Sequence, residues 1–495
     1  MTGSLFRDSG KDTALGRRTA HAGAFTLLTQ LLVFLTGFGR TVILARLLQP
    51  EDFGLVAMVL VFVSLLHTCR NAGFGMPTIQ HSGVTQAQIS TMFWITGAAG
   101  VLLAGALAAL GPVLAWVYGR QELTAITVAY AVFFVLPGFS LQHQALLERN
   151  LRFGRLALVR IGANLLGSSI AVLMAWTGWG YWSLVAFHGG DYFGLLVGGW
   201  IASGWIPGLP RRNTGVRSML HFGRRLGGVE ILNAVARNTD KFLVGRFLGD
   251  FALGLYSKAY ELLMLPVRML TVPLTKVAIP ALSRLREQPD KYRQFYYRGI
   301  RLFAMLSIPV PVVLFLLAHE IVFLLLGPKW LPMVPIFRIL TIAMLADSFD
   351  VSAWWVFISR GEGGRLFRAI AAFSVALVAA CLIGLQWGVQ GVAWAVAVTM
   401  VFARILILFY CYRKTPLRLA RLFKVLSLPF FSAMVAGACA WAAGWALGLT
   451  DWLRVVGVAG VYAAAYVAQT LMIPSLRQEV TNTAKLMLRR GRPEI

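Results

Sequence analysis

The segment VARNTDKFLVGRFLG, residues 235–249, carries four charged side chains inside a long apolar stretch. A charge at the centre of a bilayer costs about 2.5–3.5 kcal/mol on insertion scales, so such residues face a partner or a wet cavity. Arginine there can bind phosphate oxygens, because its planar fork stays protonated and donates two parallel hydrogen bonds. A carboxylate there can carry a proton or hold a cation. These residue types therefore indicate anion recognition and ion coupling.

Charged residues of this kind occur in several apolar runs of the chain. The candidate set for binding a substrate diphosphate is Arg40, Arg237, Lys241, Lys258 and Arg338. The candidate set for ion coupling is Asp191, Asp240, Glu261, Asp347 and Asp350. Arg46 and Arg246 lie near the outer boundary of their runs and are interpreted as anchors that extend to the interface.

Depth suggests an alternative, purely structural role for some of these charges. At a rise of about 1.5 Å per residue, Asp240 and Lys241 are level with Lys258 and Glu261 of the next run. Salt bridges from Asp240 to Lys258 and from Lys241 to Glu261 would then hold the two helices together. Arg237 is one turn deeper and is left as the unmatched charge.

Two acids one turn apart, Asp347 and Asp350, lie on one helix face. Mutual repulsion would raise one pKa and make that group a proton carrier. Alternatively the pair binds a monovalent cation or forms an ion pair with Arg404. His188 and Asp191 share the same spacing, which is more typical of a hydrogen bond between helices than of a proton relay.

The elements that position these residues are membrane helices. Of 495 residues, 58% are hydrophobic and only 13% are charged, with a mean hydropathy of +0.70. Apolar runs long enough to cross about 30 Å of hydrocarbon recur throughout the chain. They predict fourteen spans, at 22–48, 55–72, 90–117, 122–148, 155–177, 181–205, 224–248, 251–280, 299–326, 332–358, 366–386, 390–412, 425–448 and 452–473.

The connections between these spans alternate in charge. One set, counted with both tails and the adjoining ends of the spans, carries 32 lysines and arginines, against 3 in the opposite set counted in the same way. Arg70 is counted in the first set, in the connection after the second span. This bias predicts that the basic connections and both termini are cytoplasmic. It also accounts for the net charge of +26 without nucleic acid as a partner.

An internal repeat is predicted at an offset of 200 residues. RTVILARLLQPEDFGLVA, residues 40–57, aligns with DKFLVGRFLGDFALGLYS, residues 240–257, so that Arg46 matches Arg246 and Gly54 matches Gly254. Equivalent positions are six spans apart, which predicts two six-span units related by an axis along the membrane normal. The last two spans have no counterpart and form an added pair.

Sequence signals for catalysis are lacking. No nucleotide-binding, zinc-protease or cofactor motif is present, and the four cysteines have neither metal-ligand nor disulfide spacing. The longest connection, which contains KYRQFYYR at 291–298, is interpreted as an amphipathic interfacial helix. Trp354 and Trp355 are interpreted as part of an interfacial aromatic belt, with stacking on a sugar as the alternative.

Two quoted segments carry a resemblance to a known family. RTVILARLLQPEDFGLVA and NTDKFLVGRFLGDFALGLYSKAYELLMLP, with the fourteen-span plan, resemble the Wzx-type polysaccharide flippases of the multidrug/oligosaccharidyl-lipid/polysaccharide superfamily. The resemblance implies an all-α fold of two six-helix lobes around a central cavity. The expected divisions are a cytoplasmic tail at 1–21, an N-lobe at 22–208, a linker at 209–223, a C-lobe at 224–412, two additional spans at 413–473 and a basic cytoplasmic tail at 474–495.

The resemblance also implies a transport function. Such proteins move undecaprenyl-diphosphate-linked oligosaccharides across the bacterial inner membrane by alternating access, without ATP and with ion coupling as the usual proposal. The expected partners are this lipid-linked oligosaccharide, membrane lipid, and polysaccharide polymerase and chain-length or export proteins. The alternatives are a lipid-II-type or multidrug exporter of the same superfamily, a membrane polymerase or glycosyltransferase, and a non-transporting scaffold. The short outer connections disfavour the polymerase, and the intramembrane charges disfavour the scaffold.

Overall fold

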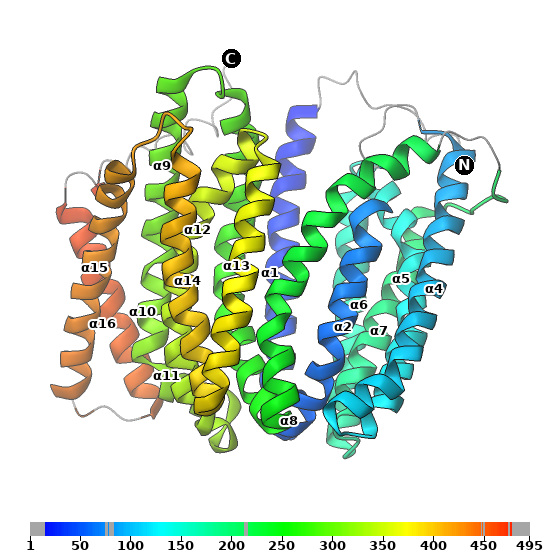
Figure 1. Cartoon of the computed structure of the whole chain (residues 1–495), viewed down its shortest axis with the longest axis horizontal. Helices are drawn as coiled ribbons and strands as arrows, with labels where there is room; N and C mark the ends of the chain where they lie inside the picture. Colours follow the sequence, from blue (N-terminus) through cyan, green and yellow to red (C-terminus); the bar gives the residue numbers. More distant parts are fainter. Residues whose placement is uncertain are drawn as a thin grey trace. The chain divides into compact units, whose positions relative to one another are not determined.

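The computed structural model describes residues 15–74, 78, 84–211, 216–446, 448, 451–473 and 476–477. Throughout these ranges the regular structure is helical, without a β-strand. Ten of the described helices are long and apolar enough to cross a membrane, and a bent helix pair adds an eleventh span when it is counted as one. The chain is therefore an all-α, multi-pass membrane protein, as predicted (Figure 1).

The chain divides into two compact units, residues 1–254 and 255–495. The N-terminal unit contains α1 (Leu15–Leu47), α2 (Pro50–Phe74), α4 (Gln86–Tyr118), α5 (Glu122–Arg149), α6 (Phe153–Trp176), α7 (Trp182–Ser203) and the first part of α8 (Val216–Arg284). The predicted linker at 209–223 includes residues 212–215, which lie outside the described ranges, and the predicted domain boundaries stay predictions.

The C-terminal unit contains the rest of α8 and the helices that follow it. These are α9 (Pro289–Ser307), α10 (Pro309–Leu316), α11 (Ala318–Leu326), α12 (Val334–Ser359), α13 (Gly363–Gly384), α14 (Gly388–Tyr412), α15 (Leu419–Ala446) and α16 (Asp451–Met472), with short 3₁₀ turns at Pro328–Met333 and Leu385–Trp387. Each of the fourteen predicted spans falls on one of these helices, on one part of α8, or on the α9–α11 series.

Helix α8 is two helices joined at Gly249. This glycine has φ 83° and ψ −176°, a conformation that side chains rarely tolerate, so the chain turns there between the predicted seventh and eighth spans. Beyond it, the axis bends by 47° between Val267 and Met269. Pro273 accounts for the bend, because its ring lacks an N–H and clashes with the carbonyl of Met269, four residues earlier.

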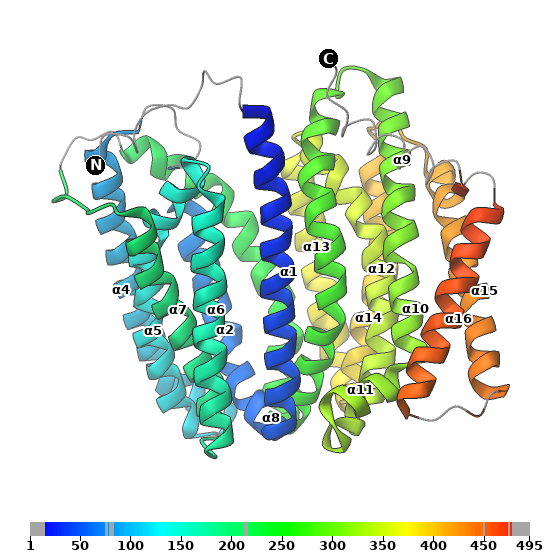
Figure 2. The ribbon, with the colours of Figure 1, turned by 180° about the vertical axis from the view of Figure 1, so that it is seen from behind.

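Small residues hold the helix pairs of the N-terminal unit together. A Cβ added to Gly194 of α7 would lie 2.6 Å from the Cα of Ala163 on α6. In the α4–α5 pair, a Cβ on Gly138 would lie 2.9 Å from the carbonyl oxygen of Thr96. In a membrane, such close backbone approach replaces the hydrophobic effect as the source of helix association. Helix α1 packs on α6 (Figure 2), and Arg40 of α1 reaches the ring of Phe187 on α7.

Tyrosines connect the helices of the C-terminal unit. Pro309 has no N–H, so the carbonyl of Met305 lacks its usual helical donor. The Tyr466 hydroxyl of α16 donates to this carbonyl at 3.0 Å, and Tyr462 donates to the carbonyl of Pro309 at 3.2 Å. The added pair α15–α16 is thereby attached to the α9–α10 span.

One sequence interpretation is confirmed in part in this unit, and another is wrong. Residues 291–298 lie in the amphipathic helix α9, as predicted, with Tyr292, Tyr296 and Tyr297 buried, and α9 leads into a span that continues through α10. Their interfacial position stays a prediction. Trp355 does not belong to an interfacial belt. It is 1% exposed, and its indole N–H donates to the Thr275 hydroxyl at 3.0 Å.

Candidate functional site

Two of the predicted phosphate-binding arginines have side chains without a polar partner among the described residues. Arg237, on the first part of α8, is exposed and forms no hydrogen bond or ion pair with any described residue. Arg338 of α12 is also exposed. Its guanidinium carbon lies 5.9 Å from the centre of the Phe315 ring, and no described residue pairs with its charge. In each unit, therefore, an exposed arginine within an apolar helix carries a positive charge that no described residue compensates.

The other charges of α8 are more deeply placed. Asp240 is 5% exposed, and its Oδ1 accepts from the backbone N–H of Lys241 at 2.8 Å. Lys258 is 4% exposed and pairs with Glu261, one turn further along, at 2.9 Å. Glu261 thus has a partner on its own helix. The predicted bridges between Asp240 and Lys258 and between Lys241 and Glu261 stay predictions.

Asp347 on α12 forms an ion pair that the sequence analysis left as one of three alternatives. Its Oδ1 lies 3.0 Å from the guanidinium of Arg404 on α14, and both side chains are largely buried. The same guanidinium lies 5.0 Å from the centre of the Phe373 ring. The side chain of Asp350 lies outside the described residues.

In the N-terminal unit, Arg40 and Asp191 come together. The guanidinium carbon of Arg40 lies 3.4 Å from the centre of the Phe187 ring on α7, and Arg40 is near enough to Asp191 to attract its carboxylate. Gly167 of α6 makes room for this arrangement, because a Cβ there would lie 3.2 Å from the Cβ of Asp191. One predicted phosphate-binding residue and one predicted ion-coupling residue are therefore neighbours in the same helix cluster.

A second arginine of this unit is buried although the sequence pattern does not predict it. Arg70, counted by sequence with a connection, is 3% exposed inside α2, and its guanidinium carbon lies 5.0 Å from the centre of the Phe134 ring. Tyr192 and His67 lie close enough to interact with it electrostatically. The available signal was the spacing of His67 and Arg70, one helical turn apart at the end of an apolar run.

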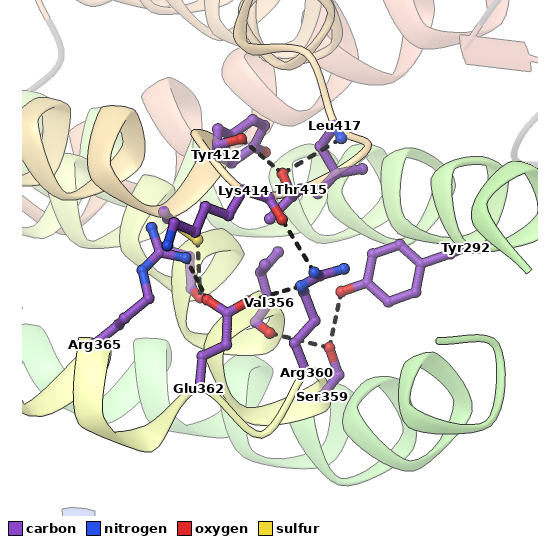
Figure 3. A network of polar contacts seen from close by, with 12 residues as sticks. Tyr292, Val356, Ser359, Arg360, Glu362, Arg365, Tyr412, Lys414, Thr415 and Leu417 are labelled. Atoms are coloured by element: carbon purple, nitrogen blue, oxygen red, sulfur yellow. Dashed lines mark hydrogen bonds and ion pairs between the residues drawn. The ribbon is translucent and has the colours of Figure 1, made fainter. Parts of the chain in front are cut away.

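A polar network joins the ends of four helices in the C-terminal unit (Figure 3). Glu362, in the turn between α12 and α13, accepts from Arg360 at 2.9 Å and also from Arg365. Arg360 donates to the carbonyl of Lys414, beyond the end of α14, at 3.0 Å. The hydroxyls of Tyr292 and Ser359 are 2.8 Å apart and add α9 to the network. Arg360, which this carboxylate holds, thereby links the α12–α13 turn to the segment after α14.

Glu362→Gln is expected to destabilise the protein at neutral pH and not at acid pH. Burial raises the pKa of Glu362, but the hydrogen bonds and charges of Arg360 and Arg365 outweigh it and hold the pKa below its ordinary value. A carboxyl with a lowered folded-state pKa stabilises the fold above its unfolded-state pKa, and this contribution is lost as the pH falls through the folded-state value. Thermal unfolding of both proteins across this pH range measures the difference, and an equal difference at every pH would contradict the assignment.

The arginines and carboxylates described above are suited to binding an anion and a proton. Arginines without a carboxylate partner can hold an anion, and a largely buried carboxylate beside an arginine can respond to protonation. Among the described residues, no group of three or more histidines, cysteines or acids is placed to hold a metal ion.

Comparison with known proteins identifies a matching family and several similar proteins. Residues 43–335 match the family described as "Polysaccharide biosynthesis protein". The teichuronic acid biosynthesis protein TuaB of Bacillus subtilis is 28% identical, over 66% of this chain and 69% of its own. The lipopolysaccharide biosynthesis protein WzxC of Escherichia coli is 22% identical, over 79% of this chain and 78% of its own. The succinoglycan biosynthesis transport protein ExoT of Rhizobium meliloti is 25% identical, over 61% of each chain.

Solved structures share the fold at lower identity. The lipid II flippase MurJ, in an inward closed conformation, superposes with a TM-score of 0.72 at 14% identity and covers 91% of this chain and 98% of its own. An inward-facing multidrug transporter of the MOP superfamily has a TM-score of 0.61 at 14% identity, over 80% of this chain and 96% of its own. At these identities the likeness concerns the fold alone, which is that of membrane transporters.

Proposed function

Because the chain belongs to the polysaccharide biosynthesis protein family, we propose that it is a flippase for a polyprenyl-diphosphate-linked oligosaccharide. The substrate is an undecaprenyl-linked repeat unit that moves from the cytoplasmic to the periplasmic leaflet of the bacterial inner membrane. Transport proceeds by alternating access without ATP hydrolysis. The basic connections and both termini face the cytoplasm, in agreement with their charge bias.

The observation that carries this proposal is the state of Arg237. An exposed guanidinium in an apolar helix, with no hydrogen bond or ion pair to a described residue, retains its full capacity to bind an anion. A diphosphate offers several oxygens that match the guanidinium fork. Arg338 is in the same state in the C-terminal unit and is a second candidate for binding phosphate. The names of the relatives support a polysaccharide precursor as the cargo.

The proposed coupling is to an ion gradient through a carboxylate. Asp347 and Asp191 are the strongest candidates because each lies beside an arginine within its own unit. Protonation of such a carboxylate removes its attraction for the arginine, which links proton binding to helix packing. Asp240, Glu261 and Asp350 remain candidates on their sequence positions alone.

Arg237→Ala is expected to reduce leaflet transfer of a lipid-linked oligosaccharide by about tenfold or more, since a charge-assisted hydrogen bond to phosphate contributes roughly 1.5–3 kcal/mol. Arg237→Lys should retain part of the activity, because a lysine keeps the charge but not the fork. The measurement is transfer in proteoliposomes, together with polysaccharide yield in cells at matched protein levels.

Arg246→Ala is the matched control, because Arg246 lies on the same helix and is exposed. Its guanidinium carbon lies 5.5 Å from the centre of the Phe247 ring. It should transport at the wild-type rate. Unchanged transfer by Arg237→Ala at normal protein levels would refute the phosphate contact. Equal transport of lipid II or of a cationic drug in the same vesicles would favour the alternative exporters.

A further inference from the structure

A groove runs along the outside of the α6–α7 pair in the N-terminal unit. Its volume is about 580 Å³, and its lining is apolar except for Arg155 at one end. Leu158 and Leu166 of α6 and Phe193 and Ile201 of α7 form its walls, and all four side chains are exposed. The groove is therefore open and apolar, on the surface of a membrane protein whose surrounding solvent is hydrocarbon.

Glycines create the groove between these large side chains. Gly198 packs against Val159, with an added Cβ only 3.1 Å from a Val159 methyl, so the two helices approach closely along its base. Gly162, on the same face of α6, faces open space, since a Cβ there would meet nothing within 4 Å. The base is thus closed by backbone contact, while the space above Gly162 is available to a ligand.

Among the described residues, Arg155 has one hydrogen bond and no counter-charge. Its guanidinium donates to the carbonyl of Ala202, in the last turn of α7, at 3.2 Å. It has no ion pair with any described residue. By contrast, Arg160 on the same helix pairs with Glu148 at 2.9 Å. The apolar groove therefore ends at a positive charge that no described residue compensates.

The length of the groove matches one leaflet. From Arg155 to Leu166 is eleven residues of helix, or about 16 Å, roughly half of the 30 Å hydrocarbon thickness. Arg155 is the last residue of the basic segment ERNLRFGR, residues 148–155, which joins α5 to α6, so the groove occupies the half of the bilayer next to that segment. A single fatty acyl chain spans this distance, whereas a long polyprenyl chain exceeds it.

We propose that this groove binds an anionic glycerophospholipid of the adjacent leaflet, with one acyl chain between α6 and α7 and the phosphate on Arg155. Charge complementarity places the headgroup, because phosphate supplies the counter-charge that the described residues do not. The apolar walls hold the chain, and the open face above Gly162 admits it. The bound lipid is part of the structure of the N-terminal unit. The proposal is independent of which cargo the protein transports.

Native mass spectrometry of the purified, delipidated protein tests this site. Phosphatidylglycerol and phosphatidylcholine with identical acyl chains are titrated onto the wild type and variants. The wild type is expected to bind one phosphatidylglycerol more tightly than phosphatidylcholine. Arg155→Gln should weaken phosphatidylglycerol binding by about tenfold, the effect of losing a charge-assisted hydrogen bond. Gly162→Leu should fill the groove and abolish binding of both lipids.

Two matched variants control for fold and charge. Gly105→Leu adds the same side chain at a glycine of α4 that also faces open space, and it should leave lipid binding unchanged. Arg160→Gln removes an equal charge from α6 outside the groove and should also leave binding unchanged. If Gly162→Leu fails to fold, Gly162→Ala together with Arg155→Gln decides the matter.

Three results would overturn the proposal. The first is equal binding of phosphatidylglycerol by the wild type, Arg155→Gln and Gly162→Leu. The second is displacement of the bound lipid by undecaprenyl phosphate but not by excess phosphatidylglycerol, which would assign the groove to the substrate carrier. The third is full competition by inorganic phosphate alone, which would leave no role for the acyl chain.

Discussion

Gly254→Ala is expected to lower the free energy of unfolding by about 1–3 kcal/mol, the usual cost of forcing extra volume into a packed site. A Cβ at Gly254 would stand 1.9 Å from the carbonyl oxygen of Pro50, far inside van der Waals contact. The contact atom belongs to the backbone, so no side chain can rotate to relieve the clash. The start of α2 and the second part of α8 would have to separate.

The same contact occurs in reverse at Gly54. A Cβ there would stand 1.9 Å from the carbonyl oxygen of Asp250, so Gly54→Ala should destabilise the protein to a similar extent. Thermal unfolding in detergent, followed by the fraction of monodisperse protein, measures both variants. Gly105→Ala is the control, because its Cβ would meet nothing within 4 Å. A melting temperature for Gly254→Ala equal to that of the control would contradict the packing argument.

The reciprocity of this contact bears on the predicted repeat. At the offset of 200 residues, Pro50 is equivalent to Asp250 and Gly54 to Gly254. Gly54 packs on the backbone of Asp250, and Gly254 packs on the backbone of Pro50, so the two contacts are equivalent. A symmetric crossing of two equivalent helix starts would produce this arrangement. The contact gives the offset a physical counterpart, while the organisation of the whole repeat stays a prediction.

The helices could be predicted from the sequence because the bilayer permits few alternatives. An apolar run of sufficient length must be a helix whose backbone groups bond internally, so hydropathy alone located the spans. At Gly249 the hydropathy pattern also locates the boundary between two spans. The predicted boundary between 224–248 and 251–280 falls on the one residue of α8 with non-helical backbone angles.

Pairing of side chains could not be predicted in the same way. Arg70 was assigned to a connection because it ends an apolar run, yet it is buried against Phe134, a residue more than sixty positions away. Trp355 was assigned to an interface because aromatics near span ends often lie there, yet its helix turns it toward Thr275. Composition and depth along one helix do not specify rotation about its axis, which depends on neighbours distant in the sequence.

Arg237 illustrates the opposite outcome. By sequence, Arg237 is the unmatched charge because it lies one turn deeper than Asp240 and Lys241, and the structure leaves it without a partner among the described residues. The absence of a partner could be anticipated because acids are scarce, with 20 aspartates and glutamates against 46 lysines and arginines. In a chain with this imbalance, the identity of each pair is hard to predict, but an excess of unpaired cations is certain.

Replacing either member of the Asp347–Arg404 pair alone is expected to destabilise the C-terminal unit. Asp347→Asn leaves the Arg404 guanidinium without its carboxylate, and Arg404→Gln leaves the carboxylate without its cation. Removing one partner of a fully buried pair costs about 3–5 kcal/mol, and the partial exposure of both side chains makes this an upper bound here. The double variant Asp347→Asn/Arg404→Gln should recover much of the loss, because neutral amides can pair with each other.

The double variant also separates a structural role of Asp347 from ion coupling. If the carboxylate carries the coupling proton, the double variant should be stable yet transport at the same rate with and without a pH gradient across the vesicle membrane. If the pair only holds α12 against α14, the double variant should respond to the gradient as the wild type does. The measurements are thermal unfolding and gradient-driven transfer in proteoliposomes. Single variants as stable as the wild type would show that the ion pair contributes nothing to the fold, and Asp347 would then have to be explained by transport alone.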